Sequence, residues 1–287
     1  AEIRSISREL LGRMVAQGGG DICEEFSSRM PIRVFNAWMN LKPEQSASLA
    51  EVGRRYNVAV QSNDEAATKE TSLKLYEMAR AVVADRKANP LPVDVDAASS
   101  LLAARVDGQP LPEEMIVGTI RQVLVVGIIA PTVMIGSIAV HLARDPKLQQ
   151  HLREHPELSE AATEEFLRLY TPYRGFARTA RTDVTLHGRT IPAGEPIALV
   201  YASANRDDEV FEDAGSFRLD RPNMKESVAF GRGPHMCPGA PLARLEMRVA
   251  LEELLAHTPR GFTLAGDIIP TRFPEYGALR VPLKFGC

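Results

Sequence analysis

The chain has 287 residues, 45% of them hydrophobic, so it can bury a large core as one big domain or two ordinary ones. Its 34 Lys and Arg against 37 Asp and Glu give a net charge of -3, which excludes the basic excess that nucleic-acid binding requires. Cys23, Cys237 and Cys287 are too few and too scattered for a disulfide framework, and the first residues lack the pattern of a secretory signal. These features predict a cytoplasmic protein with no nucleic-acid partner.

Helical spacing of apolar residues dominates the first part of the chain, over residues 1–90. The three glycines at 18–20 are expected to end the first helix, and residues 88–96 are predicted to form a loop. Leu111-Pro112-Glu113-Glu114 is typical of a helix start, so a long helix is predicted from there. A further helix is predicted over residues 158–170, ended with the help of Pro172.

The long helix contains 18 consecutive uncharged residues, 123–140, which is enough to cross a membrane. The interior Pro131, the polar Thr132 and Ser137, and the position in mid-chain favour a helix buried on all sides instead. We therefore expect no membrane association.

The spacing of apolar residues changes after residue 180. Residues 183–202 alternate apolar and polar side chains around turns at His187-Gly188 and Pro192-Ala193-Gly194, which predicts short hairpin strands. A last long helix follows residue 239, with one apolar face, and residues 269–286 are predicted to form a final small hairpin. The fold class is therefore mainly α with small β-sheets (α+β). The residues expected on the apolar face of the last helix are Leu242, Leu245, Val249 and Leu254.

The decapeptide FGRGPHMCPG at residues 230–239 places one cysteine among three glycines, directly before that last helix. The free N–H groups and positive dipole end of a helix N-terminus favour a thiolate at Cys237. One thiolate on a tight loop, with His235 two residues earlier, suits the single axial ligand of a haem iron. The glycines that would let the loop turn and approach a flat ring are Gly231, Gly233 and Gly239.

Two other interpretations of Cys237 remain open at this point. A free cysteine is usually a small buried hydrophobic residue. A nucleophilic cysteine would need a histidine base, and His235 at two residues' distance within a turn is poorly placed for that role. No recognisable oxyanion loop accompanies the pair.

The same decapeptide resembles the cysteine-ligand loop of the haem-thiolate cytochromes P-450, whose pattern F-G-x-G-x-H-x-C-x-G it matches at all six specified positions. The resemblance implies a single haem-thiolate domain over residues 1–287 that binds haem b. It further implies that Cys237 is the proximal iron ligand, that Phe230 packs beside the sulfur, and that His235 hydrogen-bonds a haem propionate. Gly231 and Gly239 are then cofactor-binding positions of the loop.

Further matches occur in the family's order. Glu165 and Arg168 resemble the E-x-x-R helix motif, and Arg221 resembles the arginine that completes its buried ion-pair network. Taken alone, Glu and Arg three residues apart are also what any amphipathic helix offers as a surface pair. Their position before the cysteine loop favours the structural triad.

A haem-propionate arginine is also implied by the resemblance. Arg178 lies where the family keeps it, and a guanidinium suits bidentate carboxylate binding. Arg174 and Arg181 are close enough in sequence to be confused with it, and a solvated arginine is the simpler alternative.

The chain departs from the family in two ways. First, Ala1 aligns near the family's D helix, so roughly the family's first quarter is expected to be absent. Second, the register of the long helix from Gly127 places Ile129 where Asp or Glu is usual and Ala130 where Thr is usual, although that acid-alcohol pair normally delivers protons to bound dioxygen. Pro131 should free the carbonyl of Gly127 and kink the helix, and Thr132 nearby would then help to hold a water; a kink that only shapes the pocket is the alternative.

The resemblance implies a soluble, bacterial-type monooxygenase. It would insert one oxygen atom from dioxygen into a small or medium hydrophobic molecule, with electrons from a separate ferredoxin or flavodoxin-type donor. Arg232, Arg244 and Arg248 are candidates for meeting an acidic donor. The Ile129-Ala130 substitution allows peroxide-driven or otherwise atypical haem-thiolate oxidation as an alternative. A non-catalytic partner protein is a second alternative, which the intact thiolate loop disfavours.

Overall fold

Helices dominate the computed structural model, which describes residues 1–286; Cys287 lies outside the described residues. Several helices begin with an aspartate whose side chain accepts a backbone N–H of the first turn: Asp64, Asp96 and Asp145. The helices are α1 (Glu2–Ala16), α2 (Arg29–Trp38), α3 (Pro43–Ser62), α4 (Glu65–Ala88), α5 (Ala97–Ala103), α6 (Glu113–Arg144), α7 (Pro146–Glu154), α8 (Ser159–Leu169), α9 (Tyr201–Ala204) and α10 (Ala240–His257). Shorter turns are the π-helix η1 (Cys23–Ser27) and the 3-10 turns η2 (Pro156–Leu158), η3 (Met224–Glu226) and η4 (Gly233–His235).

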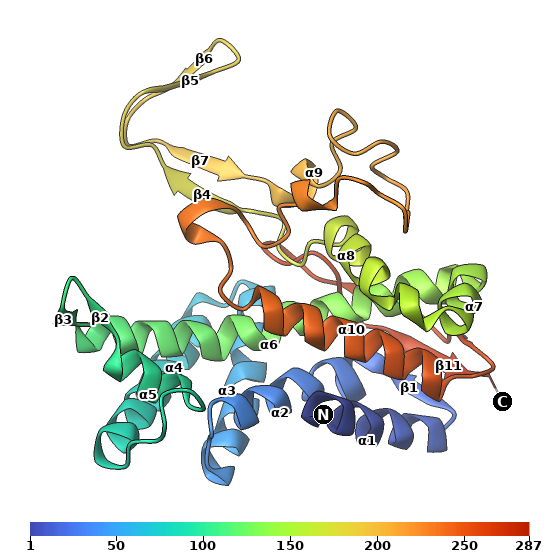
Figure 1. The fold of residues 1–287 in the computed structure, drawn as a ribbon, viewed down its shortest axis with the longest axis horizontal. Helices are drawn as coiled ribbons and strands as arrows, with labels where there is room; N and C mark the ends of the chain where they lie inside the picture. Colours follow the sequence, from blue (N-terminus) through green and yellow to red (C-terminus); the bar gives the residue numbers. More distant parts are fainter. Residues whose placement is uncertain (287) are drawn as a thin grey trace.

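The sheets are small and antiparallel. β1, β11 and β8 form one sheet in that order, and β10–β9, β2–β3, β4–β7 and β5–β6 form pairs. The last two pairs project from the helical body (Figure 1). The strands are β1 (Gly19–Asp21), β2 (Arg105–Val106), β3 (Gln109–Pro110), β4 (Phe176–Thr179), β5 (Val184–Leu186), β6 (Arg189–Ile191), β7 (Pro196–Leu199), β8 (Phe262–Leu264), β9 (Ile269–Pro270), β10 (Ala278–Arg280) and β11 (Pro282–Phe285).

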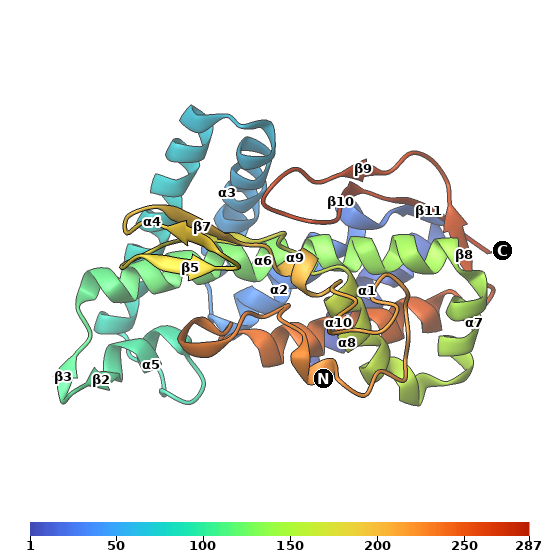
Figure 2. The same cartoon turned by 90° about the horizontal axis from the view of Figure 1, so that it is seen from above.

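α6 is the axis of the fold. α3 and α4 lie on one side of it and α10 on the other (Figure 2). It is also the one helix of residues 1–286 long and apolar enough to cross a membrane, and 67% of its most apolar window is buried inside the protein. The helix continues through Pro131. The uncharged run is therefore largely core, as its polar interior positions predict.

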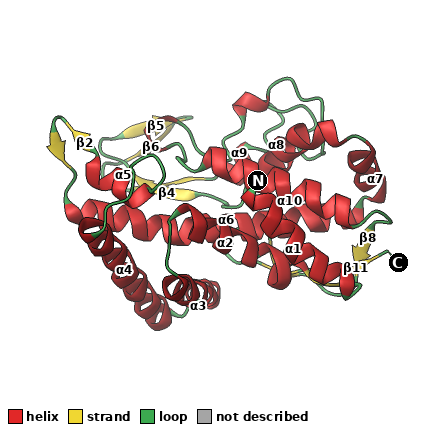
Figure 3. Cartoon of the chain, turned by 60° about the horizontal axis from the view of Figure 1, so that its bottom comes forward, coloured by secondary structure: helices red, strands yellow, loops and turns green. Residues whose placement is uncertain are grey.

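Two clusters of buried apolar side chains meet along α6. One joins the C-terminal half of α6 to α1, η1, α8 and α10, and the other joins the N-terminal half to α2, α3, α4 and α5. α1 packs along α10 (Figure 3), although the two helices are far apart in sequence. Each fully buried Leu, Ile or Phe contributes roughly 1.5–3 kcal/mol, so this packing holds both ends of α6 in place.

The expected mainly α fold with small sheets is confirmed, and the sequence patterns fail in two details. Gly19 and Gly20 do more than end the first helix, because they pair with β11 as part of β1. A Cβ on Gly19 would lie 2.2 Å from the Leu283 carbonyl oxygen, so only glycine fits this close approach. On α10, Leu245 is 41% exposed rather than part of the apolar face, whereas Val249 and Leu254 are buried.

Candidate functional site

The cysteine loop is a compact turn held by its own backbone. The Cys237 N–H donates to the Phe230 carbonyl at 2.8 Å, and the Met236 N–H donates to the Gly233 carbonyl at 3.0 Å. Gly231 and Gly233 have φ angles of +70° and +69°, a region that favours glycine, so the turn depends on these two residues. The loop thus brings the two ends of the decapeptide together.

Cys237 is half-buried and free, three residues before the start of α10. The orphan N–H groups and the dipole of that helix end favour negative charge there. A Cβ on Gly239 would lie 3.8 Å from the Cys237 sulfur, in ordinary contact, so the sulfur is not tightly enclosed on that side. The arrangement suits a thiolate offered to a ligand outside the loop.

Phe230 anchors the loop to the body of the protein. Its ring packs against the core cluster around α10, and the Arg244 guanidinium lies 4.6 Å from the ring centroid. Arg244 is in turn paired with Glu164 of α8 at 2.6 Å. The loop is therefore tied to both α8 and α10.

The residues that could bind the haem propionates differ in how far their side chains already make contacts within the protein. His235 and Arg178 are exposed, and the Arg178 side chain donates to the neighbouring Ala177 carbonyl at 2.9 Å. Arg174 instead donates to the Glu275 carbonyl at 3.0 Å and stacks on Tyr276. Arg181 is exposed as well. The structure thus leaves Arg178 and Arg181 available to an anion and commits Arg174 to the fold.

The stretch of α6 around Ile129 and Ala130, here called the α6 wall, has no acidic side chain at the position where dioxygen activation usually requires one. Ile129 is buried, and Ala130 is half-buried beside it. The Thr132 hydroxyl points toward the Ser27 carbonyl of η1 (2.9 Å) and the Ile128 carbonyl (2.8 Å). Both acceptors are backbone carbonyls, so the hydroxyl is already engaged within the protein. This geometry does not support the expectation that Thr132 helps to hold a water beside the Gly127 carbonyl.

Gly127 is required by packing. A Cβ at this position would lie 2.2 Å from the ring of Phe35 on α2, so only glycine lets the two helices approach this closely. The half-buried side chains nearest to it on the helix, Val126 and Ala130, form an apolar strip. These residues give the wall shape and hydrophobicity but no proton donor.

A buried ion-pair network supports the segment that leads into the loop. Glu165 accepts from Arg168 at 2.7 Å through each carboxylate oxygen and from Arg221 at 2.8 Å. The Arg218 N–H adds a fourth bond at 2.9 Å. Arg168 also donates to the carbonyls of Asn205 and Ala214, so α8 is fastened to residues 205–221. The structure brings all three predicted triad residues together.

Sequence reasoning missed a polar cluster beside the site. Gln61 of α3 donates to the buried Glu275 carboxylate at 2.5 Å and accepts from the Arg272 N–H at 2.6 Å. Burial raises the pKa of Glu275, and burial together with the nearby Glu275, Tyr56 and Cys237 raises the pKa of the Tyr173 phenol. No local sequence pattern predicts contacts between residues this far apart in the chain.

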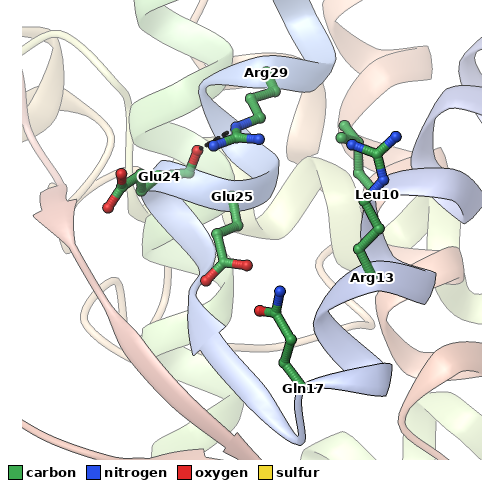
Figure 4. A pocket seen from close by; sticks show the side chains of 6 residues that line it. All are labelled: Leu10, Arg13, Gln17, Glu24, Glu25 and Arg29. Atoms are coloured by element: carbon green, nitrogen blue, oxygen red, sulfur yellow. Dashed lines mark hydrogen bonds between the residues drawn. The ribbon is translucent and has the colours of Figure 1, made fainter.

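Two cavities lie away from the cysteine loop. One of about 480 Å³ lies between α1, η1 and α2, where Glu25 and Gln17 face each other (Figure 4). Its charged walls are Arg13, Glu24, Glu25 and Arg29, so it mixes both signs on mostly exposed side chains. An apolar one of about 220 Å³ lies between α3, α4 and α6. Neither includes a residue of the cysteine loop.

The residues around Cys237 fit a haem. No group of three or more His, Cys, Asp or Glu that could hold a metal is found within residues 1–286. The loop offers one sulfur donor, backbone turns without side chains at Gly231 and Gly233, and the exposed His235; β4 adds the exposed Arg178 as a second group for the propionates. The donor set therefore matches a haem-thiolate site.

Glu246, on α10 beyond the loop, is 2% exposed, and its Oε1 is buried without a hydrogen-bond partner. Burial raises its pKa from 4.5 to about 8. The folded chain thus keeps this proton up to about pH 8, whereas the unfolded chain releases it near 4.5. The contribution of Glu246 to stability is full below about pH 4.5, and we expect this contribution to fall by about 3–5 kcal/mol as the pH rises toward 8.

Glu246→Gln should remove most of this pH dependence, as urea unfolding at pH 5, 7 and 9 would show. Glu77→Gln, at an exposed position of α4, is the matched control and should leave the slope unchanged. An equal slope in wild type and Glu246→Gln would show that Glu246 does not hold the proton.

Comparison with known proteins agrees with this geometry. The family model described as Cytochrome P-450 matches residues 59–258. The mycinamicin IV hydroxylase/epoxidase of Micromonospora griseorubida is 35% identical over 98% of this chain and 70% of its own length. Cytochrome P-450 109 of Bacillus spizizenii is 31% identical over 98% of this chain and 71% of its own length. Among solved structures, the bacillaene polyketide synthase cytochrome P-450 PksS of Bacillus subtilis has a TM-score of 0.91 at 27% identity, covering 100% of this chain and 74% of its own.

Proposed function

Because the chain belongs to the cytochrome P-450 family, we propose that it inserts one oxygen atom from dioxygen into a small or medium hydrophobic molecule, with electrons from a separate donor protein. At the family level it is a haem b oxidoreductase, a haem-thiolate monooxygenase. The observation that carries the proposal is the glycine turn that holds a half-buried Cys237 ahead of α10.

Each site residue has a proposed task. Cys237 would bind the iron, and the α10 N-terminus would keep its sulfur ionised. His235 and Arg178 would bind the propionates, while Phe230 would shield the sulfur and Gly231 and Gly239 would let the ring approach. When bound, the haem supplies the iron at which dioxygen is reduced and oxygen is transferred. Glu165, Arg168 and Arg221 would hold the supporting segment, and residues 1–287 would act as one haem domain.

The substrate wall is apolar, which supports a hydrophobic substrate. Val126 and Ala130 of α6 are half-buried apolar side chains, and the ring of the exposed Phe176 of β4 lies 5.1 Å from that of Tyr173. Among the similar proteins, one carries the name of a mycinamicin IV hydroxylase/epoxidase, and a structure from Bacillus megaterium (TM-score 0.89, 28% identical) was solved with testosterone. These apolar side chains would exclude water and position the carbon atom of the substrate that reacts.

The electron donor is proposed to be a ferredoxin or flavodoxin-type protein in the cytoplasm. Arg232, Arg244 and Arg248 lie on the exposed side of the loop and of α10, where an acidic surface could meet them. Each already has a glutamate partner, at 2.9, 2.6 and 3.2 Å respectively. Docking of an acidic donor would therefore replace these arginine–glutamate contacts rather than pair unpartnered arginines. The arginines would thus increase the rate of encounter with the donor more than the affinity for it.

A second candidate function is peroxide-driven oxidation. It is favoured by the α6 wall, where Ile129 and Ala130 carry no proton donor and Thr132 is directed at backbone carbonyls. Hydrogen peroxide brings both electrons and both protons with the oxygen, so a protein using it has less need of an acid at this position. The intact cysteine loop and triad argue against a non-catalytic role.

Turnover with isotopically labelled dioxygen distinguishes the two candidates. With a reducing partner, we expect one labelled oxygen atom in the product and consumption of several reductants per product, because Ile129 and Ala130 carry no proton donor. Ile129→Asp with Ala130→Thr should then improve coupling severalfold, since it supplies the missing donor; general acid-base groups contribute about 10²–10⁴-fold. Product formed efficiently from peroxide, with no labelled oxygen incorporated under reductant, would replace the first candidate by the second.

A further inference from the structure

Two histidine rings lie against each other at the end of α7, which forms one edge of the molecule (Figures 1 and 2). His151 and His155 are four residues apart, so their side chains are neighbours on the helix surface. Their ring centroids are 4.7 Å apart, and this is the one contact between two histidine rings within residues 1–286. Both side chains are exposed. The pair is therefore accessible to a ligand in solution and lies outside the site described above.

The separation of the rings suits two ligands of one metal ion. An imidazole nitrogen binds Zn²⁺ at about 2.0–2.1 Å. With about 1.1 Å from nitrogen to ring centre, two rings on one ion have centroids about 4.5 Å apart when the bonds meet at a right angle, and about 5.2 Å apart at a tetrahedral angle. The observed 4.7 Å lies between these values, so the spacing is that of a bidentate pair.

A carboxylate already fixes the tautomer of one ring. Nδ1 of His155 lies 3.0 Å from Oε1 of Glu157. Because a carboxylate only accepts, the neutral ring donates from Nδ1 and keeps its lone pair on Nε2. Histidines that bind metals usually have such a carboxylate on their other nitrogen, where it orients the ring and raises its basicity. The ring of His151 makes no hydrogen bond to any residue of 1–286, so its nitrogens are available as well.

The charges near the pair also favour a cation. The pair lies in the last turn and at the C-terminal cap of α7, where the helix dipole is negative. The exposed Glu154 and Glu157 add negative charge, and Lys147, one turn before the pair, opposes it. Arg153 instead donates to oxygens of α7 and α10, so its charge is directed into the protein. Two acids thus outnumber one lysine on the exposed part of this segment.

We propose that His151 and His155 bind one divalent transition-metal ion of the class that prefers imidazole nitrogen, such as Zn²⁺, Cu²⁺ or Ni²⁺, through one nitrogen of each ring. Glu157 is a positioning residue, because it holds the His155 ring without touching the ion. The pair supplies two ligands and water supplies the others; a group of three or more protein ligands is not found within residues 1–286. The ion fastens the last turn of α7 where the chain turns toward η2 and α8.

Calorimetric titration of the haem-loaded chain with nickel chloride tests the site. Ni²⁺ is the probe because imidazole suits it, whereas thiolates of free cysteines select other metals. Wild type should bind one Ni²⁺ per chain in its tightest phase. His151→Ala and His155→Ala should each weaken this phase by at least about tenfold, and Glu157→Gln by about tenfold. The haem-free chain should give the same differences, so the result does not depend on the proposed oxygenase function.

Gln150→His combined with His151→Ala is the matched control. It keeps six histidines but sets the pair five residues apart, so the two rings leave a common face of the helix. This variant should bind Ni²⁺ as weakly as His151→Ala does. His187→Ala, which removes an exposed histidine between β5 and β6, should change the affinity less than about twofold. Tight binding that survives His151→Ala, or that the double variant restores, would overturn the proposal.

Discussion

Cys237→Ala is expected to abolish the red-shifted absorption band of the reduced, carbon monoxide-bound protein and to reduce product formation to background. The band requires a thiolate opposite the bound gas, and Cys237 is the half-buried sulfur that a glycine turn holds before α10. The spectrum of the reconstituted chain measures this directly. Haem content should be measured alongside, because loss of the axial bond also weakens retention of the cofactor.

Cys23→Ala is the control for this experiment. Cys23 is a buried thiol whose Sγ lies 3.6 Å from the Ala278 carbonyl, and burial raises its pKa to about 12. A thiol of this kind is a packing residue, so its removal should leave the band intact and cost about 1 kcal/mol of stability. A thiolate band that survives Cys237→Ala would refute the assignment of the iron ligand.

Glu165→Ala should cost about 3–5 kcal/mol of folding free energy, the largest stability change expected of a single substitution here. The side chains of Glu165 and Arg168 are 1% and 0% exposed, and the carboxylate is the shared ion-pair partner of Arg168 and Arg221. Removal of the carboxylate leaves the two buried guanidinium groups of Arg168 and Arg221 close together without the acid that they share. Urea unfolding of the haem-free and haem-loaded chains measures the loss.

Glu160→Ala provides the comparison on the same helix. Glu160 is exposed and pairs with Arg248 at 3.2 Å, so this change should cost only about 0–1 kcal/mol. Glu165→Gln, which keeps the shape but not the charge, should be nearly as harmful as Glu165→Ala. A Glu165→Ala protein within about 1 kcal/mol of wild type would mean that water or another acid replaces the carboxylate.

Local sequence patterns carry much of the fold. The 3.6-residue spacing marks the helices, and the turns at His187-Gly188 and Gly194 match left-handed backbone between β5, β6 and β7. The polar residues within 123–140 correctly indicate a core helix rather than a membrane span. These successes share a cause, since each depends on neighbours in sequence.

Long-range contacts could not be predicted in this way. The role of Gly19 in a strand depends on β11, and the bond between Gln61 and Glu275 joins α3 to the C-terminal hairpin. The direction of the Thr132 hydroxyl is set by the Ser27 carbonyl of η1, which no helix pattern reveals. Likewise Arg121 has the sequence of an ordinary surface arginine, and only the packing of α3 and α4 encloses it.

The pairing of β1 with β11 has a consequence for synthesis of the chain. Gly19 lies opposite Lys284, and α1 packs on α10, so α1 and β1 are completed only by elements of residues 240–285, which are made much later. During translation the apolar side of α1, which includes Leu10, Leu11 and Met14, has no partner. The apolar side of α1 is therefore covered late, after residues 240–257 have been made, because contacts between segments this far apart in sequence form slowly.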